Sequence, residues 1–102
     1  MALIYHIVLP EAWATFDTDL YRSVSLETEG FIHCSFPGQL DSVVERYYGG
    51  VHDIVVLEID TEKLMSRVLN EASTANEIYP HVYGPINRDA IISATHRTLN
   101  AR

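Results

Sequence analysis

The chain lacks most of the features that assign a protein to an exported or membrane class. Its 102 residues include a single cysteine, Cys34, which has no partner for an internal disulfide and is typical of a reducing compartment. No stretch approaches the roughly 18 apolar residues of a membrane helix, and the N-terminus has no basic segment ahead of a long apolar run. We therefore expect a cytoplasmic protein with no membrane partner.

Basic residues are also few. Seven Lys and Arg residues stand against fourteen Asp and Glu residues, which gives a formal net charge of −7 at pH 7. Because an acidic domain repels phosphate backbones, we expect no extended nucleic acid among its partners. A small nucleotide is still compatible with this charge, since a local pocket can be positive within an acidic surface.

The common nucleotide-binding, hydrolase and metal motifs are absent. The chain has no Walker loop, no Gly-x-Gly-x-x-Gly and no Gly-x-Ser-x-Gly. Its five histidines show no His-x-x-x-His spacing, and one cysteine cannot supply a Cys pair. We predict no metal site, and the commonest nucleotide and hydrolase classes are excluded.

What is present is ordinary globular composition, with 47% apolar and 21% charged residues. This length is near the commonest size of one domain, so we expect a single domain over residues 1–102. Five segments have the apolar pattern of strands: residues 2–9, 31–35, 54–59, 79–83 and 90–99. Weaker signals predict short strands at 24–26 and 67–70, followed by a loop over 71–76.

Two helices are expected between these strands. The first begins at Pro10 and ends near Asp17 to Asp19, and the second spans residues 37–48 and ends at Gly49-Gly50. Strands outnumber helices and alternate with them irregularly. The sequence therefore predicts an α+β fold with a mixed, mostly antiparallel sheet and two main helices.

The segment around His33 is the first candidate site. Alternate side chains of a strand share a face, so Ser35 and His33 point one way while Cys34 points into the core. If the extended chain reaches back through Gly30, Glu29 joins the His33 side, where its carboxylate can orient the imidazole. An acid, an imidazole and a hydroxyl could then line one wall of a cleft. The alternative is a half-buried histidine that only binds a neighbouring loop.

Two other histidines carry similar alternatives. His6 lies on an apolar strand face, where a lone imidazole is more often a core residue with its hydrogen bonds satisfied than a catalytic group. Tyr79, His81 and Tyr83 alternate in an extended segment and could form an aromatic wall that stacks a base or a nicotinamide ring. The same three residues could instead pack against a sheet edge.

Three segments together resemble the domain-of-unknown-function 952 family: Tyr5-His6-Ile7, residues 25–35 and residues 79–86. The strand at 55–60 also fits. The resemblance implies a fold related to ADP-ribosyltransferases, including the RNA 2′-phosphotransferases, with split sheets and a cleft for NAD or an ADP-ribosylated group. One departure lies in the helix 37–48, where members often carry Ala-Asn ahead of an aromatic pair and this chain has Val44-Glu45.

The resemblance also implies roles for individual residues. We assign catalysis to four of them: His6, which would hold a ribose, Glu29, His33 and His81. Glu71 and Glu77 are alternatives for the carboxylate that an oxocarbenium-like transition state needs. Ligand binding is assigned to Ser25, Ser35, Glu77, Tyr83 and Gly84.

The function that follows is an ADP-ribosyl or NAD-utilising enzyme, with NAD as the implied cofactor and a small nucleotide-like molecule as the ligand. One alternative is a non-catalytic sensor of a nucleotide or ADP-ribose. Another is a partner-binding domain, such as a toxin–antitoxin component, with its histidines packed in the core. Fold resemblance alone does not choose among them, because one fold hosts many functions.

Overall fold

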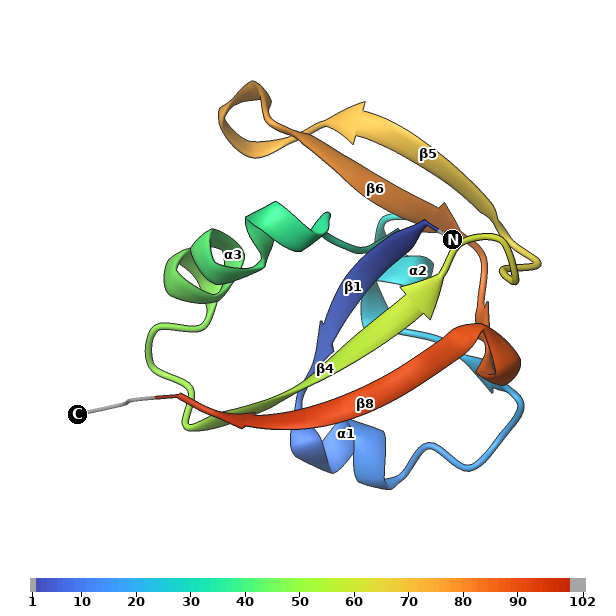
Figure 1. Ribbon diagram of the computed structural model, residues 1–102, viewed down its shortest axis with the longest axis horizontal. Coiled ribbons are helices and arrows are strands. Elements are labelled where there is room, and N and C mark those ends of the chain that lie inside the picture. The colour runs from blue at the N-terminus through green and yellow to red at the C-terminus, as the bar shows by residue number, and fades with distance from the viewer. Residues whose placement is uncertain (1, 100–102) are drawn as a thin grey trace.

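The computed structural model describes residues 2–99, which form two three-stranded sheets and a two-stranded ribbon (Figure 1). The first sheet has the order β1-β4-β8, with bounds Leu3–Val8, Asp53–Asp60 and Ile91–Thr98. The second has the order β3-β6-β5, with bounds Ile32–His33, Ile78–Tyr83 and Arg67–Ala72. The ribbon pairs β2 (Leu20–Tyr21) with β7 (Ile86–Asn87). All of these pairings are antiparallel, which confirms a mostly antiparallel α+β fold.

Three short α-helices accompany the sheets: α1 (Pro10–Ala14), α2 (Val24–Thr28) and α3 (Leu40–Tyr47). Single 3-10 turns lie at Pro37–Gln39, Thr74–Asn76 and Arg88–Ala90. Proline opens both α1 and the 3-10 turn before α3, as the sequence predicts. Between residues 2 and 99, no helix has the length and apolarity needed to cross a membrane.

The main core lies between the two sheets. The strand β4 is paired on both edges, and its side chains Ile54, Leu57 and Ile59 have no exposed surface. Leu57 and Ile59 pack in one cluster with Ile32 of β3 and Val82 of β6. Because burial of apolar area is the main stabilising term, this contact between the sheets holds the fold together.

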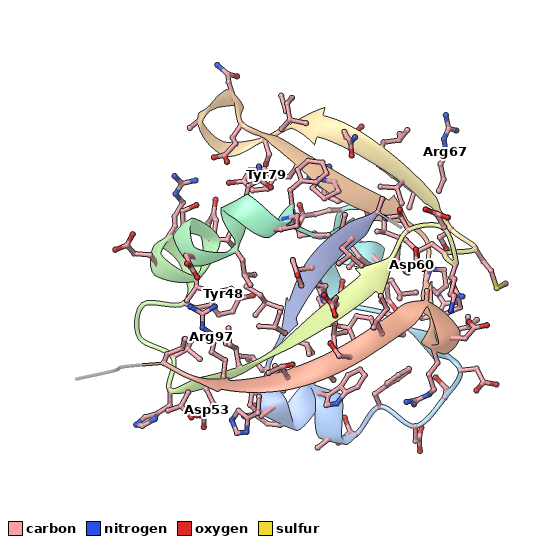
Figure 2. The ribbon with its side chains drawn as sticks, in the orientation of Figure 1. Tyr48, Asp53, Asp60, Arg67, Tyr79 and Arg97 are labelled. Carbon is pink, nitrogen blue, oxygen red and sulfur yellow. The ribbon has the colours of Figure 1, made fainter. Side chains whose placement is uncertain are left out.

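The other face of the first sheet is covered by α3. Val44 of α3 packs against Ile7 of β1 and Val56 of β4. Figure 2 shows Arg97 on the α3 side of β8, where its guanidinium donates to Asp41 at 2.9 Å. The sheet therefore separates the main core from a smaller cluster beneath α3.

The two sheets meet edge to edge at one point. Tyr5 of β1 and Ser35, two residues beyond β3, exchange backbone hydrogen bonds of 2.8 Å and 2.7 Å. Beyond this bridge the edge of β1 that faces away from β4 has no paired strand in the described part of the chain. The rest of that edge is therefore available to line a cavity.

Residues 24–28 correct one expectation. A weak signal predicts a strand at 24–26, but the segment is the helix α2. Leu26 packs against the core while Val24 is exposed. The amides of Glu29 and Gly30 both bond the Ser25 carbonyl, and Gly30 ends the helix with a φ of +91°.

Two boundaries also differ from the prediction. The first helix ends at Ala14, because Thr15 bonds back to close the turn and the chain then runs to β2. The strand β5 continues to Ala72, since Glu71 and Ala72 pair with Tyr79 and Ile78 of β6. The predicted loop at 71–76 is therefore shorter than expected, because backbone pairing with β6 outweighs the low strand propensity of these residues.

Gly84 occupies a position that excludes a side chain. Its φ is +155°, and a Cβ built there would collide with the side chain of Ser66. The Gly84→Ala variant should lose about 2 kcal/mol of unfolding free energy, measured by urea denaturation. Gly38→Ala is the matched control, because a Cβ at Gly38 meets no atom within 4 Å. Equal stability of the two variants would contradict this account.

Candidate functional site

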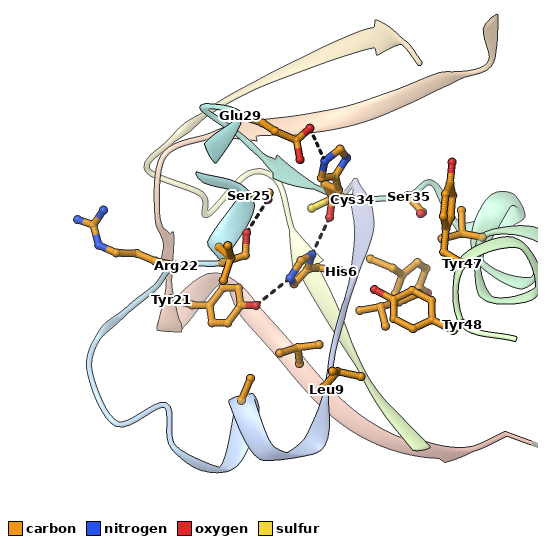
Figure 3. Close-up of a pocket in the computed structure, with 18 of the residues that line it drawn as sticks. His6, Leu9, Tyr21, Arg22, Ser25, Glu29, Cys34, Ser35, Tyr47 and Tyr48 are labelled. Atoms are coloured by element: carbon orange, nitrogen blue, oxygen red, sulfur yellow. Dashed lines mark hydrogen bonds and ion pairs between the residues drawn. The ribbon is translucent and has the colours of Figure 1, made fainter. Parts of the chain in front are cut away.

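A pocket of about 930 Å³ opens along the free edge of β1 (Figure 3). Residues 5–9 of β1 and the following turn line one side, and residues 21–25 ahead of and within α2 line another. Val43, Tyr47 and Tyr48 of the α3 region line a third. The volume lies in the range of roughly 300–1,000 Å³ that small-molecule sites occupy.

His6 lies in the floor of the pocket with both ring nitrogens bonded. Its Nδ1 is 2.6 Å from the His33 carbonyl oxygen, and its Nε2 is 2.9 Å from the Tyr21 hydroxyl (Figure 3). Burial lowers the pKa of His6 from 6.5 to about 4, so the ring is neutral at pH 7. His6 is therefore a buried histidine with both hydrogen bonds satisfied, the alternative to a catalytic role. The His6 ring has no free nitrogen to bind a ribose.

Glu29 and His33 form a pair at the rim of the same pocket. The His33 Nε2 lies 3.1 Å from Glu29 Oε1, and each side chain is about half exposed, at 49% and 50%. Glu29 follows α2 directly and His33 is in β3, so the turn at Gly30 brings them together. Both residues belong to the pocket lining.

The two predicted serines also line the pocket, with their hydroxyls in different situations. Ser25 Oγ donates to the Phe31 carbonyl at 2.8 Å, so Ser23, at 2.8 Å, donates to Ser25. These bonds fix the turn that carries Glu29. Ser35 is buried beside the bridge to Tyr5. Cys34 is buried in the main core, where burial raises the pKa of its thiol.

His81 and Tyr83 lie outside the pocket lining, in a second cluster on the β5–β6 face. The same oxygen of Glu71 accepts hydrogen bonds from His81 Nδ1 and the Tyr83 hydroxyl, each at 2.7 Å. These two donors lower the pKa of Glu71, Tyr83 contributing most. The ring of Phe31 stacks on His81 at 4.0 Å and covers it. His33 touches this cluster, because its ring centroid is 5.5 Å from that of His81.

Glu77 and Gly84 have structural positions away from the pocket. Glu77 accepts from the Gln39 amide at 3.0 Å and from the Tyr79 hydroxyl at 3.2 Å, which ties β6 to the start of α3. Gly84 forms the turn after β6 beside Ser66. Of the expected aromatic wall at 79–83, Tyr79 is the member that lines the pocket.

Several pocket residues were not singled out from the sequence. Tyr5, Tyr21, Tyr47 and Tyr48 all line the cavity, and Tyr47 is 55% exposed at its mouth. Tyr47 and Tyr48 fit the helical pattern of residues 37–48, which indicates a helix and not a site. Tyr21 had no periodic signal, because β2 is only two residues long.

Arg22 is the basic residue of the lining. Figure 3 shows its side chain at the rim, with the guanidinium extending away from His6. Among residues 2–99, no group of three or more His, Cys, Asp or Glu side chains could hold a metal ion. Besides its aliphatic and aromatic side chains, the lining therefore contains hydroxyls, the buried His6, one acid–imidazole pair and a peripheral cation.

Comparison with solved structures shows the same fold in one protein of Caulobacter crescentus. The crystal structure of its protein CC0527 matches with a TM-score of 0.80 and 26% sequence identity, over 97% of this chain and 87% of that one. The solution NMR structure of CC0527 matches with a TM-score of 0.82 and 27% identity, over 99% and 89%. No curated protein matches the chain. The family described as "Protein of unknown function (DUF952)" matches residues 7–94, and the chain therefore belongs to that family.

Proposed function

We propose that the pocket binds a ribosyl nucleotide, with NAD as the leading candidate, and that the Glu29–His33 pair acts on its N-glycosidic bond. The observation that carries this proposal is the 3.1 Å contact of an acid and an imidazole, both half exposed at the rim of a 930 Å³ pocket. We also infer an ADP-ribosyltransferase-type fold, related to that of RNA 2′-phosphotransferases. Two antiparallel sheets joined at one edge beside the pocket support that inference.

The proposed reaction breaks one bond to the ribose and forms another. The bond between C1′ of the ribose and the ring nitrogen of nicotinamide breaks, and its electron pair leaves with the nicotinamide. The carboxylate of Glu29 stabilises the positive charge that develops on the ribose. Water or an acceptor hydroxyl then attacks C1′, and its proton passes to Nδ1 of His33, the nitrogen that does not bond Glu29.

The rest of the lining suits the same ligand. Tyr47, which is 55% exposed, and the half-buried Tyr48 offer aromatic rings on which a base or a nicotinamide can stack. Arg22 can neutralise part of a diphosphate by turning its guanidinium toward the cavity. His6 acts as a positioning residue, because its Nδ1–H bonds the backbone carbonyl of His33.

The second cluster has a supporting role in this proposal. Phe31 contacts the His33 ring edge-on at 4.8 Å and stacks on His81 at 4.0 Å. Glu71 holds His81 in place from the other side. His81 is therefore assigned to positioning Phe31 and His33, not to contact with the ligand.

Calorimetric titration with NAD, combined with chromatographic detection of released nicotinamide, tests the proposal. We expect binding in the micromolar range and nicotinamide release that depends on intact protein. Binding of NAD without release of nicotinamide would favour the alternative, a non-catalytic nucleotide sensor. The outward direction of Arg22, the one Arg or Lys of the lining, also fits that alternative. If the protein neither binds NAD nor releases nicotinamide, both nucleotide functions are refuted. A 2′-phosphorylated RNA oligonucleotide, assayed in parallel, covers the phosphotransferase reaction.

A further inference from the structure

The floor of the pocket contains two hydrogen bonds whose direction is fixed by the backbone. The carbonyl of His33 can only accept, so His6 Nδ1 carries the hydrogen in the 2.6 Å bond between them. In a neutral imidazole the other nitrogen is then an acceptor. The hydroxyl of Tyr21 must therefore donate its one hydrogen to His6 Nε2, at 2.9 Å.

Both groups hold these protonation states at neutral pH. Burial lowers the pKa of His6 to about 4 and raises the pKa of Tyr21 to about 12. The Tyr21 ring is also held in place, at 5.6 Å from Phe16 and 5.3 Å from His6 between ring centroids. The hydroxyl is therefore a fixed group whose hydrogen is committed to the protein.

The Tyr21 hydroxyl can offer a ligand a hydrogen-bond acceptor only. Tyr21 lines the pocket, and its oxygen retains two lone pairs after donating to His6. It can accept a hydrogen bond but cannot donate one. We propose that Tyr21 is a specificity-determining residue that accepts a hydrogen bond from a ribose hydroxyl of the ligand and disfavours a phosphate at the same place.

This inference rests on the proposed function and narrows its substrate class. A phosphate monoester presents oxygen acceptors, which would face the lone pairs of Tyr21 with no hydrogen between them. A buried acceptor left unpaired costs free energy, so a site built for a hydroxyl discriminates strongly against a ligand that cannot donate. The charge of Glu29 agrees with this, because a carboxylate in the pocket lining repels the dianion of a phosphate monoester placed near it. NAD or ADP-ribose is therefore favoured over 2′-phosphorylated RNA.

The hydrogen-bond direction can be measured without any ligand. In ¹⁵N-labelled protein, the ring nitrogen shifts of His6 report which nitrogen carries hydrogen. We expect hydrogen on Nδ1 and none on Nε2 at pH 7. Hydrogen on Nε2 would make Tyr21 a potential donor and would overturn the inference.

The specificity role is tested with Tyr21→Phe and a set of monodeoxy NAD analogues, by calorimetry. Loss of the acceptor should weaken NAD binding about tenfold. The analogue that lacks the recognised hydroxyl should bind both proteins equally. If Tyr21→Phe weakens NAD and every analogue by the same factor, or weakens none, Tyr21 does not select a hydroxyl. A melting curve of Tyr21→Phe establishes that the variant is folded, since His6 loses a donor.

The two proposals fail in different ways. If the wild-type protein does not bind NAD, the proposed function is wrong, and so is the assignment of a ribose to Tyr21. The ring nitrogen shifts of His6 still decide whether the Tyr21 hydroxyl donates or accepts in its hydrogen bond with His6. If NAD binds and Tyr21→Phe leaves its affinity unchanged, the proposed function stands and the specificity role is wrong. Tighter binding of 2′-phosphorylated RNA than of NAD would also overturn the specificity role.

Discussion

Lowering the pH from 7 to 4 should remove about 3 kcal/mol of stability through His6 alone. The pKa of this residue is about 4 in the folded protein, against 6.5 for the solvated imidazole of an unfolded chain. Between these values the unfolded chain binds a proton that the folded protein does not. Unfolding is therefore favoured as the pH falls through 6.5, and the loss levels off below pH 4.

Urea denaturation at a series of pH values measures this effect. Carboxylates with a lowered pKa, such as Glu71, add to acid destabilisation, so the test is the difference between the wild type and His6→Gln. Glutamine keeps one donor and one acceptor but does not titrate. The His6→Gln variant should lose less stability than the wild type between pH 7 and pH 4. The control variant His52→Gln, which replaces an exposed histidine, should lose as much as the wild type. Parallel pH profiles of wild type and His6→Gln would contradict the burial of a neutral His6.

Replacing His33 by alanine should reduce nicotinamide release from NAD by about two to three orders of magnitude. The reason is that Nδ1 of His33 is assigned the proton of the attacking hydroxyl and no other imidazole lies free in the pocket lining, where His6 has both nitrogens bonded. Glu29→Gln should have a similar effect, because the amide is neutral and cannot stabilise developing positive charge. Initial rates at saturating NAD measure both changes.

The pattern of KM and kcat separates catalysis from binding. A loss in kcat with little change in KM is expected for His33→Ala and Glu29→Gln, because both groups act mainly in the transition state. His96→Ala is a control outside the pocket, since its side chain is 62% exposed and pairs with Asp53. Because the Glu29–His33 pair is half exposed, neither variant should change the melting temperature strongly. Full activity of His33→Ala would rule out this mechanism.

The parts of the site that depend on nearby residues could be predicted from the sequence. Glu29 and His33 are four residues apart and were expected on one side of an extended chain, but the turn at Gly30, with a φ of +91°, is what brings them together. Strand parity separated His33 from Cys34, which is buried in the core. Long apolar strands such as β4 were also recognised, because their pattern is continuous over several residues.

What could not be predicted depends on contacts between distant segments. Tyr21 bonds His6 across fifteen residues of sequence, and Tyr48 reaches the same pocket from α3. The ribbon of β2 and β7 has two residues in each strand, too few for a periodic signal. His81 shares a strand face with residues near the site, but the stacked ring of Phe31 covers it. Tertiary packing decides each of these outcomes.

The bridge between Tyr5 and Ser35 has a consequence for how related proteins can diverge. It joins the sheets through backbone hydrogen bonds alone, which most residue types can make. Both residues belong to the pocket lining, so either can be exchanged while the backbone hydrogen bonds that join the sheets are kept. We expect members of this family to retain the frame and to differ in the ligands they accept at these two positions.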